Sequence, residues 1–383
     1  MWRLAFVAVF FGLTLLPGLQ MLTGALSIAP VDENRTLAPP VTAGTSFDAV
    51  PRVADRWFAD HFGLRSLLIR LKTQVDFTVF GMSDRVLVGH DGQLFYRSVV
   101  NVEEPAMDQV LAVKEAAALA GIGRVTRALK DAGIDTAFVV NMMSDRFYPE
   151  LLPKVAVPRP LQPRIDDFIA RLRALPDVNY IDSEAILRHA MQTRRVFHRT
   201  DFHWNDPAAF DVARALVDRI SAGEGRPSSA WTHSLKIGTQ RISGAIAMFM
   251  PLFVPPTEDA LTVEQSWDWP AGFSQSVNQG LFEYSTASTD ARLLSPTVFV
   301  GDSFLDGMQR SGLVADFVET HRIRWKPDLK VSEIVASLPS DTRWLTFEFI
   351  EVSQTALNAF ADANDVEAAV KLLRARQRAA ENR

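Results

Sequence analysis

The sequence predicts an α/β fold in which a mostly parallel sheet is flanked by helices, and three observations lead to it. Short apolar runs alternate with helical stretches from about residue 108 onward. These runs are continuously apolar, which is typical of strands that are buried on both faces. One of them leads directly into a small polar turn, the place where open α/β sheets bind ligands. We expect strands over residues 136–140, 178–181, 297–300 and 344–349.

The composition narrows the class of protein. With 383 residues, 48% of them hydrophobic and 22% charged, the chain can bury a large core. The formal net charge of -5 argues against a nucleic-acid partner, which would need a basic face to neutralise phosphates. No cysteine is present, so disulfides, thiolate metal sites and a cysteine nucleophile are excluded. We expect neither a metal nor a cofactor.

The N-terminus is a candidate membrane segment. From Leu4 to about Leu26 the chain is almost unbroken apolar sequence. About 20 such residues suffice to cross the hydrocarbon core of a bilayer. Arg3 precedes the run, which favours a cytoplasmic N-terminus and export of the rest of the chain. We expect residues 1–27 to be a signal anchor. The alternative is a signal peptide, cleaved at the small residues 23–25.

Residues 28–95 are expected to hold a linker, a helix and a hairpin. The proline pair at residues 39–40 is typical of an extended linker. A stripe of aromatic and leucine side chains predicts a helix over about residues 47–80. Two β-rich pieces flank a His-Asp-Gly turn, whose glycine suits a positive φ, and predict a hairpin over residues 86–96.

One catalytic domain is expected over residues 96–360, with a charged C-terminal helix over residues 361–383. Within the domain, apolar periodicity predicts helices over about residues 108–131 and 164–175. The stretch from about 221 to 290 is rich in Gly, Ser, Pro and Thr and lacks a clear period. We interpret it as a long insertion over the sheet that faces the substrate. The C-terminal helix is expected to be a solvated surface helix.

A first group of candidate catalytic residues lies on a loop. Asp201 and His203 are one residue apart, and the following helix begins at Pro207, with Asn205 or Asp206 as its cap. A carboxylate two residues from an imidazole can accept its N–H, fix its tautomer and stabilise the imidazolium. An isolated pair of this kind can equally be structural.

A second group follows the strand predicted over residues 297–300. This strand runs into Gly301-Asp302-Ser303, which places Ser303 just beyond its carboxyl end. A serine at such a turn can expose its hydroxyl, and its own backbone N–H can help to bind an oxyanion. Alone, the turn could simply cap a helix. Together, the two groups supply the nucleophile, base and orienting acid of a catalytic triad.

These two groups together resemble the AlgJ/AlgX family of SGNH-hydrolase-like proteins. The specific part is Arg-Thr-Asp-Phe-His-Trp at residues 199–204, followed far downstream by Gly-Asp-Ser-Phe at residues 301–304. In that family the Asp and His precede the serine, as they do here. The resemblance covers about residues 30–355, and the N-terminal anchor makes the chain more similar to AlgJ than to AlgX. Supporting stretches are Glu33-Asn34-Arg35, Phe62-Gly63-Leu64-Arg65, residues 88–96 and Tyr148-Pro149-Glu150.

The resemblance implies an SGNH-hydrolase-like fold and a periplasmic enzyme of exopolysaccharide O-acetylation, with alginate as one such polymer. Ser303 would attack an acyl ester, His203 would take its proton, and Asp201 would orient His203. Attack on the acyl-enzyme by a sugar hydroxyl makes a transferase, and attack by water makes an acetyl esterase. Arg199 and Trp204 are the candidate substrate-binding residues.

The resemblance also implies partners and a location. The acceptor is a polysaccharide, and the acyl donor would be presented by a membrane-bound O-acyltransferase. The chain would cross the bacterial inner membrane once, with its catalytic domain in the periplasm. The sequence departs from the family pattern in two places, with Asn141-Met142-Met143 where a Pro-x-Lys step is usual and Gly244-Ala245-Ile246 where Gly-Asp-Leu is usual. These departures bear on polymer specificity and activity and leave the triad untouched.

Two alternatives stay open. His198, Asp201 and His203 form a His-x-x-Asp-x-His pattern, which could supply a metal site of two histidines and one carboxylate. The other is a non-catalytic module that binds polysaccharide or holds a biosynthetic complex together. Tryptophans that could stack on sugars in such a module are Trp204, Trp231, Trp267 and Trp269.

Overall fold

A seven-stranded mixed sheet forms the centre of the computed structural model. The strand order is β4-β3-β11-β9-β10-β8-β7. The first five strands run parallel to one another, β8 pairs antiparallel with β10, and β7 pairs antiparallel with β8. The strands are β3 (Asp135–Asn141), β4 (Asn179–Ile181), β7 (Ser274–Val277), β8 (Phe282–Ala287), β9 (Thr297–Gly301), β10 (Glu319–Arg324) and β11 (Trp344–Ile350). The structure describes residues 2–25, 29–31, 36–97, 105–154, 163–226, 236–264, 269–277, 280–351 and 353–382.

The four predicted strands are confirmed as β3, β4, β9 and β11, and the sheet is mostly parallel, as predicted. Three of these strands lie side by side, and Phe138, Phe299 and Phe347 at their centres are fully buried. Such continuous burial requires both faces of the sheet to be covered. Because parallel strands point the same way, the ends of β3, β9 and β11 meet at one edge of the sheet.

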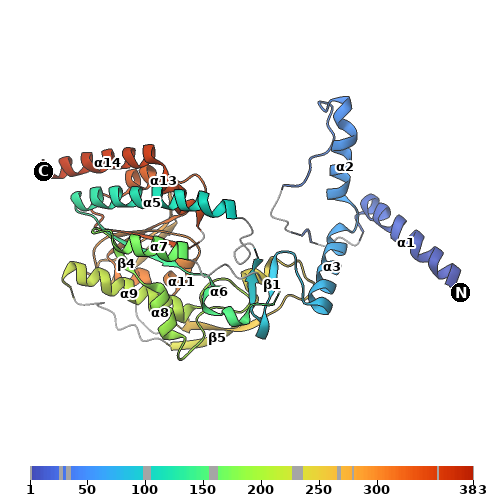
Figure 1. Cartoon of the computed structure of the whole chain (residues 1–383), viewed down its shortest axis with the longest axis horizontal. Helices are drawn as coiled ribbons and strands as arrows, with labels where there is room; N and C mark the ends of the chain where they lie inside the picture. Colours follow the sequence, from blue (N-terminus) through green and yellow to red (C-terminus); the bar gives the residue numbers. More distant parts are fainter. Residues whose placement is uncertain are drawn as a thin grey trace.

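Helices cover both faces of the sheet (Figure 1). On one side α5 packs against α13 and α14, and on the other α9 packs against α8 and α11. The helices of the body are α5 (Pro105–Asp131), α6 (Ser144–Phe147), α7 (Pro163–Arg173), α8 (Ser183–Ala190), α9 (Asp206–Glu224), α10 (Ala245–Met248), α11 (Phe304–Arg310), α12 (Val331–Ser337), α13 (Gln354–Ala361) and α14 (Ala363–Glu381). Short 3-10 turns lie at Phe47–Ala49, His90–Gly92, Pro149–Leu151 and Leu313–Asp316.

The predicted single helix over residues 47–80 is wrong, because two helices take its place. They are α2 (Val50–His61) and α3 (Arg65–Phe80), separated by a turn in which Leu64 has a φ of 63°. Gly63 in this turn lies against the backbone of Pro17, and a Cβ built on it would be 1.9 Å from the Pro17 carbonyl oxygen. The apolar period continues across the turn, which is why the sequence pattern does not show the break.

The interpretation of residues 221–290 as an insertion over the sheet is wrong in part. Its last two strands, β7 and β8, complete the main sheet through the antiparallel pairing of β8 with β10. The rest forms a separate hairpin of β5 (Lys236–Ile242) and β6 (Glu258–Glu264), with α10 between them. Residues 227–235, 265–268 and 278–279 of the stretch lie outside the described residues.

The domain boundaries predicted at residues 95 and 361 fall inside one packed unit. The predicted hairpin is confirmed as β1 (Val86–Val88) and β2 (Leu94–Tyr96), and its Leu87 and Phe95 belong to the main core. The C-terminal helix is not simply solvated, because Val366, Ala369 and Leu373 on one face of α14 are buried in the same core. A charged amphipathic helix hides such a face among its exposed residues.

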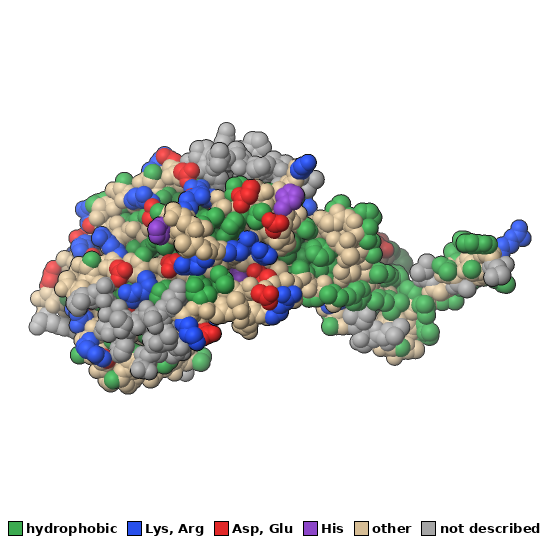
Figure 2. Space-filling model, turned by 90° about the horizontal axis from the view of Figure 1, so that it is seen from below, with side chains coloured by type: hydrophobic (Ala, Val, Ile, Leu, Met, Phe, Trp, Pro, Cys, Tyr) green, Lys and Arg blue, Asp and Glu red, His purple; other side chains and the backbone are tan. Residues whose placement is uncertain are grey.

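The N-terminal apolar segment is the helix α1 (Trp2–Thr23), which extends away from the body together with α2 and α3 (Figure 1). By length and composition, α1 alone among the helices in the described ranges is apolar enough to cross a membrane. A signal sequence passes the same test. Hydrophobic side chains gather on the surface that joins these helices to the body (Figure 2). On α3 the exposed ones are Leu68, Leu71, Val75, Val79 and Phe80.

The packing of α5 against α13 gives a stability prediction with a control in the same helix. A Cβ on Gly121 would lie 1.9 Å from the carbonyl oxygen of Phe360, whereas one on Gly123 would be 3.4 Å from Leu175. We expect Gly121→Ala to destabilise the protein by about 1–3 kcal/mol through overpacking. Gly123→Ala should be neutral or stabilise it by up to ~1 kcal/mol through helix propensity. Urea unfolding of both variants measures the difference, and equal stabilities would contradict the tight contact.

Candidate active site

Ser303 lies at the carboxyl end of β9, immediately before α11 begins at Phe304. The strand is fully buried, but Ser303 itself is partly exposed. The sequence turns from strand to helix here because Gly301 and Asp302 end the apolar run. This location matches the edge at which open α/β sheets bind ligands.

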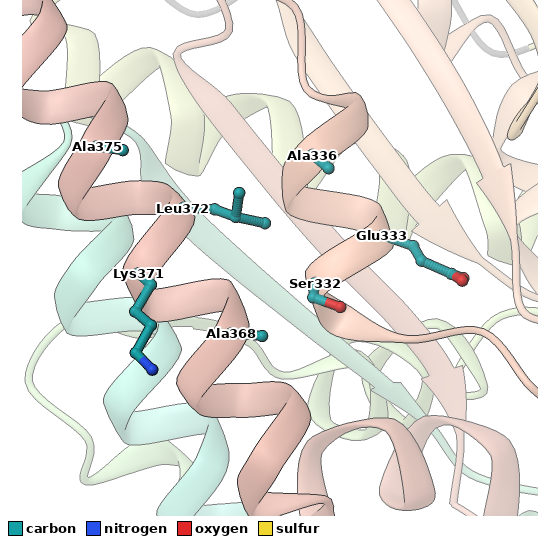
Figure 3. A pocket seen from close by; sticks show the side chains of 7 residues that line it. All are labelled: Ser332, Glu333, Ala336, Ala368, Lys371, Leu372 and Ala375. Carbon is teal, nitrogen blue, oxygen red and sulfur yellow. The ribbon is translucent and has the colours of Figure 1, made fainter.

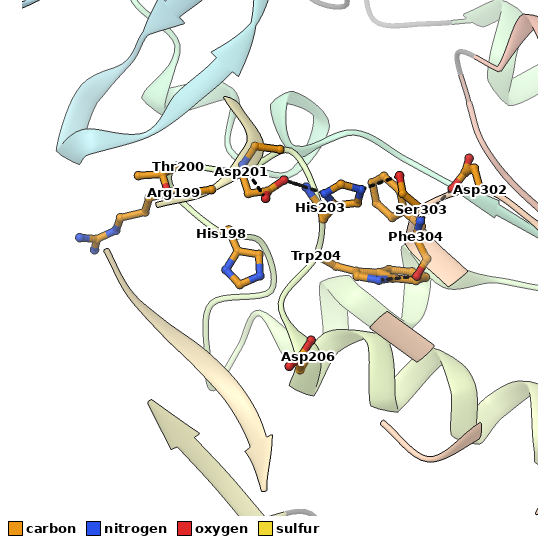
Figure 4. A network of polar contacts seen from close by, with 12 residues as sticks. His198, Arg199, Thr200, Asp201, His203, Trp204, Asp206, Asp302, Ser303 and Phe304 are labelled. Carbon is orange, nitrogen blue, oxygen red and sulfur yellow. Dashed lines mark hydrogen bonds and ion pairs between the residues drawn. The ribbon is translucent and has the colours of Figure 1, made fainter. Parts of the chain in front are cut away.

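Asp201, His203 and Ser303 form a continuous hydrogen-bonded relay (Figure 4). His203 Nε2 lies 2.7 Å from Ser303 Oγ, and His203 Nδ1 lies 2.6 Å from Asp201 Oδ1. Because an ionised carboxylate can only accept, Nδ1 carries the proton, and Nε2 is left to accept from the serine hydroxyl. This is the tautomer that a general base beside a serine requires.

The loop that carries Asp201 and His203 is fixed at both ends. On one side the buried carboxylate of Glu258 accepts the backbone N–H groups of Arg199 and Thr200 and the Thr200 hydroxyl, at 2.7–2.9 Å. On the other side Asn205 caps α9 by accepting the N–H of Ala208 at 3.1 Å, as its sequence position predicted. The spacing between Asp201 and His203 is therefore set by backbone anchors and not by the two side chains alone.

The carboxylate of Asp201 is held ionised. Burial alone would raise its pKa, but the His203 ring and the N–H groups of Ala245 and His203 bring the pKa well below its usual value. The Ala245 N–H donates to Asp201 Oδ2 at 2.8 Å, and the neighbouring Gly244 N–H donates to the Thr200 hydroxyl at 2.9 Å. One of the two stretches that depart from the family pattern, residues 244–246, therefore supports the relay directly.

Asp302 shapes the turn of Ser303. Its side chain accepts the N–H of Phe304 at 2.8 Å through Oδ1 and the N–H of Ile350 at 2.9 Å through Oδ2. The first bond closes the turn around the serine, and the second ties the turn to the end of β11. A carboxylate with both oxygens engaged in this way is a structural acceptor.

The two predicted substrate-binding residues lie in different surroundings. Trp204 is 1% exposed, donates its indole N–H to the Phe304 carbonyl at 3.1 Å and packs edge-on against the Phe304 ring. Little of its surface is left for a sugar. Arg199 is exposed and points away from Ser303 (Figure 4). It lines a second pocket of about 440 Å³ on the other side of the loop.

A smaller pocket of about 230 Å³ opens beside the relay. Its wall includes three side chains that the sequence did not single out as lining it, His198, Asp306 and Arg310. Asp306 and Arg310 lie one turn apart on α11, so the strand-to-helix turn was a signal that could have pointed to them. A hollow of about 490 Å³ between α12 and α14 is lined mainly by small and aliphatic side chains and contains no residue of the relay (Figure 3).

The metal-site alternative does not fit the geometry of the relay. His203 already uses both ring nitrogens, one for Asp201 and one for Ser303. His198 lines the same pocket. In the part of the chain that the structure describes, no three His, Asp or Glu side chains are arranged to hold a metal ion.

Comparisons of this chain with a family model and with known proteins agree on one family. The family model for an SGNH hydrolase-like domain, acetyltransferase AlgX, matches residues 86–306, which include all three relay residues. A probable alginate O-acetylase AlgJ of Pseudomonas syringae pv. tomato is 26% identical over 261 residues, 65% of this chain and 61% of the relative. Its counterpart in Pseudomonas aeruginosa is 28% identical over 193 residues, 50% of this chain and 48% of the relative. The matches thus span about three fifths and about half of these relatives.

Solved structures show the same fold. The O-acetyltransferase domain of Pseudomonas putida AlgJ superposes with a TM-score of 0.51 at 22% identity, covering 76% of this chain and 99% of that domain. Bacillus cereus PatB1, solved with a sulfonyl adduct, also has a TM-score of 0.51, at 12% identity and with 72% and 97% coverage. At these identities the similarity concerns the arrangement of the sheet and helices.

The state of Asp201 predicts how stability depends on pH. Because the folded-state pKa is depressed, its contribution is fully present above the unfolded value of about 3.9 and is lost as the pH falls below it. We expect Asp201→Asn to cost about 2 kcal/mol near pH 7, a difference that shrinks towards pH 3. Urea unfolding of both proteins across this range measures it. A constant difference would show that Asp201 is not held ionised.

Proposed function

Because this chain belongs to the family of SGNH hydrolase-like AlgX acetyltransferase domains, we propose that it transfers acetyl groups to a polysaccharide through an acetyl-serine at Ser303. The observation that carries the proposal is the Asp201–His203–Ser303 relay, with bonds of 2.6 and 2.7 Å. Nucleophile, base and orienting acid are already in contact, as a serine mechanism requires. The names of the AlgJ relatives support an acetyl group and a polysaccharide such as alginate.

In the first half-reaction Ser303 Oγ attacks the acyl carbon of an acetyl donor while His203 Nε2 takes the hydroxyl proton. The tetrahedral intermediate then expels the donor oxygen, which receives this proton from His203. Asp201 stays ionised and stabilises the imidazolium that forms between the two transfers. The backbone N–H of Ser303 is the proposed first donor to the oxyanion.

In the second half-reaction a sugar hydroxyl enters the pocket beside the relay and attacks the acetyl-serine. His203 accepts the proton of the sugar and returns it to Ser303 Oγ as the serine leaves. The pocket of about 230 Å³ has room for the acetyl group and part of a sugar ring, and Arg310 and Asp306 offer polar contacts at its wall. We keep Arg199 as a contact for a more distant part of the polymer, and we assign Trp204 to the support of the serine turn.

The N-terminal helix supports a proposed location. We propose that α1 anchors the chain in the inner membrane and leaves the catalytic domain in the periplasm, where an extracellular polymer passes. An acetyl donor presented by a membrane-bound O-acyltransferase would then be within reach. The same site acts as an esterase whenever water replaces the sugar hydroxyl.

The test is acetyl release from 4-nitrophenyl acetate by the full-length chain in detergent. We expect Ser303→Ala and His203→Ala to lower kcat about 10³–10⁴-fold or more, because members of a triad act as one unit. Asp201→Asn should cost a comparable factor through the wrong histidine tautomer. Ser288→Ala is the control and should be unchanged, because this partly exposed serine donates to the Ala271 carbonyl and lies near the amino end of β10, away from Ser303 at the carboxyl end of β9.

Acceptor sugars then separate the possible activities. Transfer of acetyl to an oligosaccharide faster than to water supports a transferase, and release to water alone supports an esterase. If the wild type and the three variants were equally inactive while all of them bound a polysaccharide, the catalytic proposal would fail in favour of a non-catalytic binding role.

A further inference from the structure

A buried glutamate lies beneath the serine turn. Glu348 is in the middle of β11 and is fully buried. One of its oxygens, Oε2, accepts the backbone N–H of Asp302 at 2.9 Å, and Oε1 accepts the side-chain N–H of Asn141 at 2.5 Å. Glu348 thus joins the ends of β3 and β9, the two strands on either side of β11.

The contact with the serine turn is close and specific. A Cβ on Gly301 would lie 2.7 Å from Glu348 Oε2, so a larger residue there would push the carboxyl group away. Asp302 makes the complementary bond in the other direction, from its own carboxyl group to the N–H of Ile350 in β11. Two side chains, one from each strand, therefore hold the backbone on either side of Ser303.

We propose that Glu348 is a positioning residue for Ser303, and that it does this work as a neutral carboxylic acid that donates its proton to Asp302. The proposal rests on the proposed function of Ser303 as the nucleophile. Glu348 touches neither substrate nor the reacting atoms, so its effect would be exerted through the placement of the serine hydroxyl against His203.

The surroundings favour one shared proton. Burial and the neighbouring Asp302 carboxyl raise the pKa of Glu348 well above its usual value, and burial also raises the pKa of Asp302. Two carboxyl groups in contact cannot both ionise without strong repulsion. From β3, Glu348 is faced by the neutral amide of Asn141, and from β9 by Asp302, whose pKa the nearby His203 tends to lower. The proton therefore belongs on Glu348 and the charge on Asp302.

This arrangement predicts that activity declines at alkaline pH, and that the decline is caused by Glu348 beneath the serine turn. As the pH rises and Glu348 ionises, its repulsion with Asp302 would open the turn and separate Ser303 from His203. A glutamine at this position keeps an acceptor for the Asp302 N–H and cannot ionise. Its NH2 group takes the place of Oε1 and faces Asn141, whose side-chain oxygen has no partner among the described residues and accepts from it once the Asn141 amide turns over. Glu348→Gln should therefore keep the geometry at all pH values.

The contribution of Glu348 to the stability of the fold should also decline as the pH rises. A folded-state pKa that is raised gives a contribution that is present below the unfolded value of about 4.3 and is lost as the pH rises. The melting temperature of Glu348→Gln should therefore gain on that of the wild type as the pH rises from 5 to 9.

The experiment compares four full-length proteins in detergent: the wild type, Glu348→Gln, Glu348→Ala and Thr346→Val. Thr346 is the matched control, because it is buried two residues earlier in the same strand and its hydroxyl has no hydrogen-bond partner among the residues that the structure describes. For each protein we would measure kcat for 4-nitrophenyl acetate between pH 5 and 9. We would also measure the rate at which phenylmethanesulfonyl fluoride modifies Ser303, and the imidazole chemical shifts of His203, with Ser303→Ala as reference.

We expect Glu348→Ala to lose about 10²-fold in kcat and in Ser303 modification, since a displacement of about 1 Å can cost this much. The imidazole chemical shifts of His203 in Glu348→Ala should move to the values found in Ser303→Ala. Glu348→Gln should stay within about threefold of the wild type at neutral pH and lack the alkaline decline. Thr346→Val should match the wild type throughout.

Three results would overturn the proposal: an unchanged Glu348→Ala, an alkaline decline that Glu348→Gln shares with the wild type, or His203 shifts that do not respond to Glu348→Ala. If Glu348→Ala does not fold, the pH profile of Glu348→Gln decides. If the wild type shows neither turnover nor modification of Ser303, the proposed function fails. The His203 shifts and the pH dependence of melting then still decide whether Glu348 positions the serine.

Discussion

The bond of 2.7 Å between His203 and Ser303 is the constraint on which the rest of the structure depends, because its two partners lie 100 residues apart in the chain. A hydrogen bond tolerates errors of only a few tenths of an ångström. The two loops must therefore be held by rigid neighbours. Trp204 and Phe304, the residues that follow His203 and Ser303, meet through a hydrogen bond of 3.1 Å and a ring contact. Each reactive side chain is thus adjacent in sequence to the residue that fixes its distance from the other.

The support of the site is built from buried or half-buried acids that bind backbone N–H groups. Glu258 holds the loop of Asp201, while Asp302 and Glu348 hold the turn of Ser303. A buried carboxyl group is costly unless its oxygens are bonded. Here the oxygens find their partners in loop N–H groups that the sheet and helices leave without partners, so one interaction satisfies both groups. Short polar loops at a sheet edge can in this way be as well defined as the strands they follow.

The sequence predicts the centre of the fold and the relay, but neither the edge of the sheet nor the support of the relay. Apolar runs predict β3, β9 and β11 because burial on both faces demands them. The polar run Glu-Thr-His-Arg-Ile-Arg of β10 does not look like a buried strand. Its Arg322 can be buried because Glu283 and Asp306, from elsewhere in the chain, neutralise it, and the local sequence does not reveal these partners. Glu258 is hidden for the same reason, since it lies about 60 residues from the loop that it holds. Glu348 sits inside a correctly predicted strand, but its role depends on a register that periodicity does not reveal.

The two departures from the family pattern acquire a common meaning in the structure. Residues 244–245 supply N–H groups to the Thr200 hydroxyl and the Asp201 carboxylate, and Asn141 supplies an amide N–H to Glu348. Both departures therefore lie in the layer that supports the relay and not among the groups that react. A backbone N–H can be supplied by any residue except proline, so the first position constrains the chain conformation more than the side chain. At the second, Asn141 stands where the pattern has proline, and a proline side chain has no N–H to donate to Glu348. Changes of this kind alter the hydrogen bonds beneath the nucleophile while the three reacting side chains stay the same.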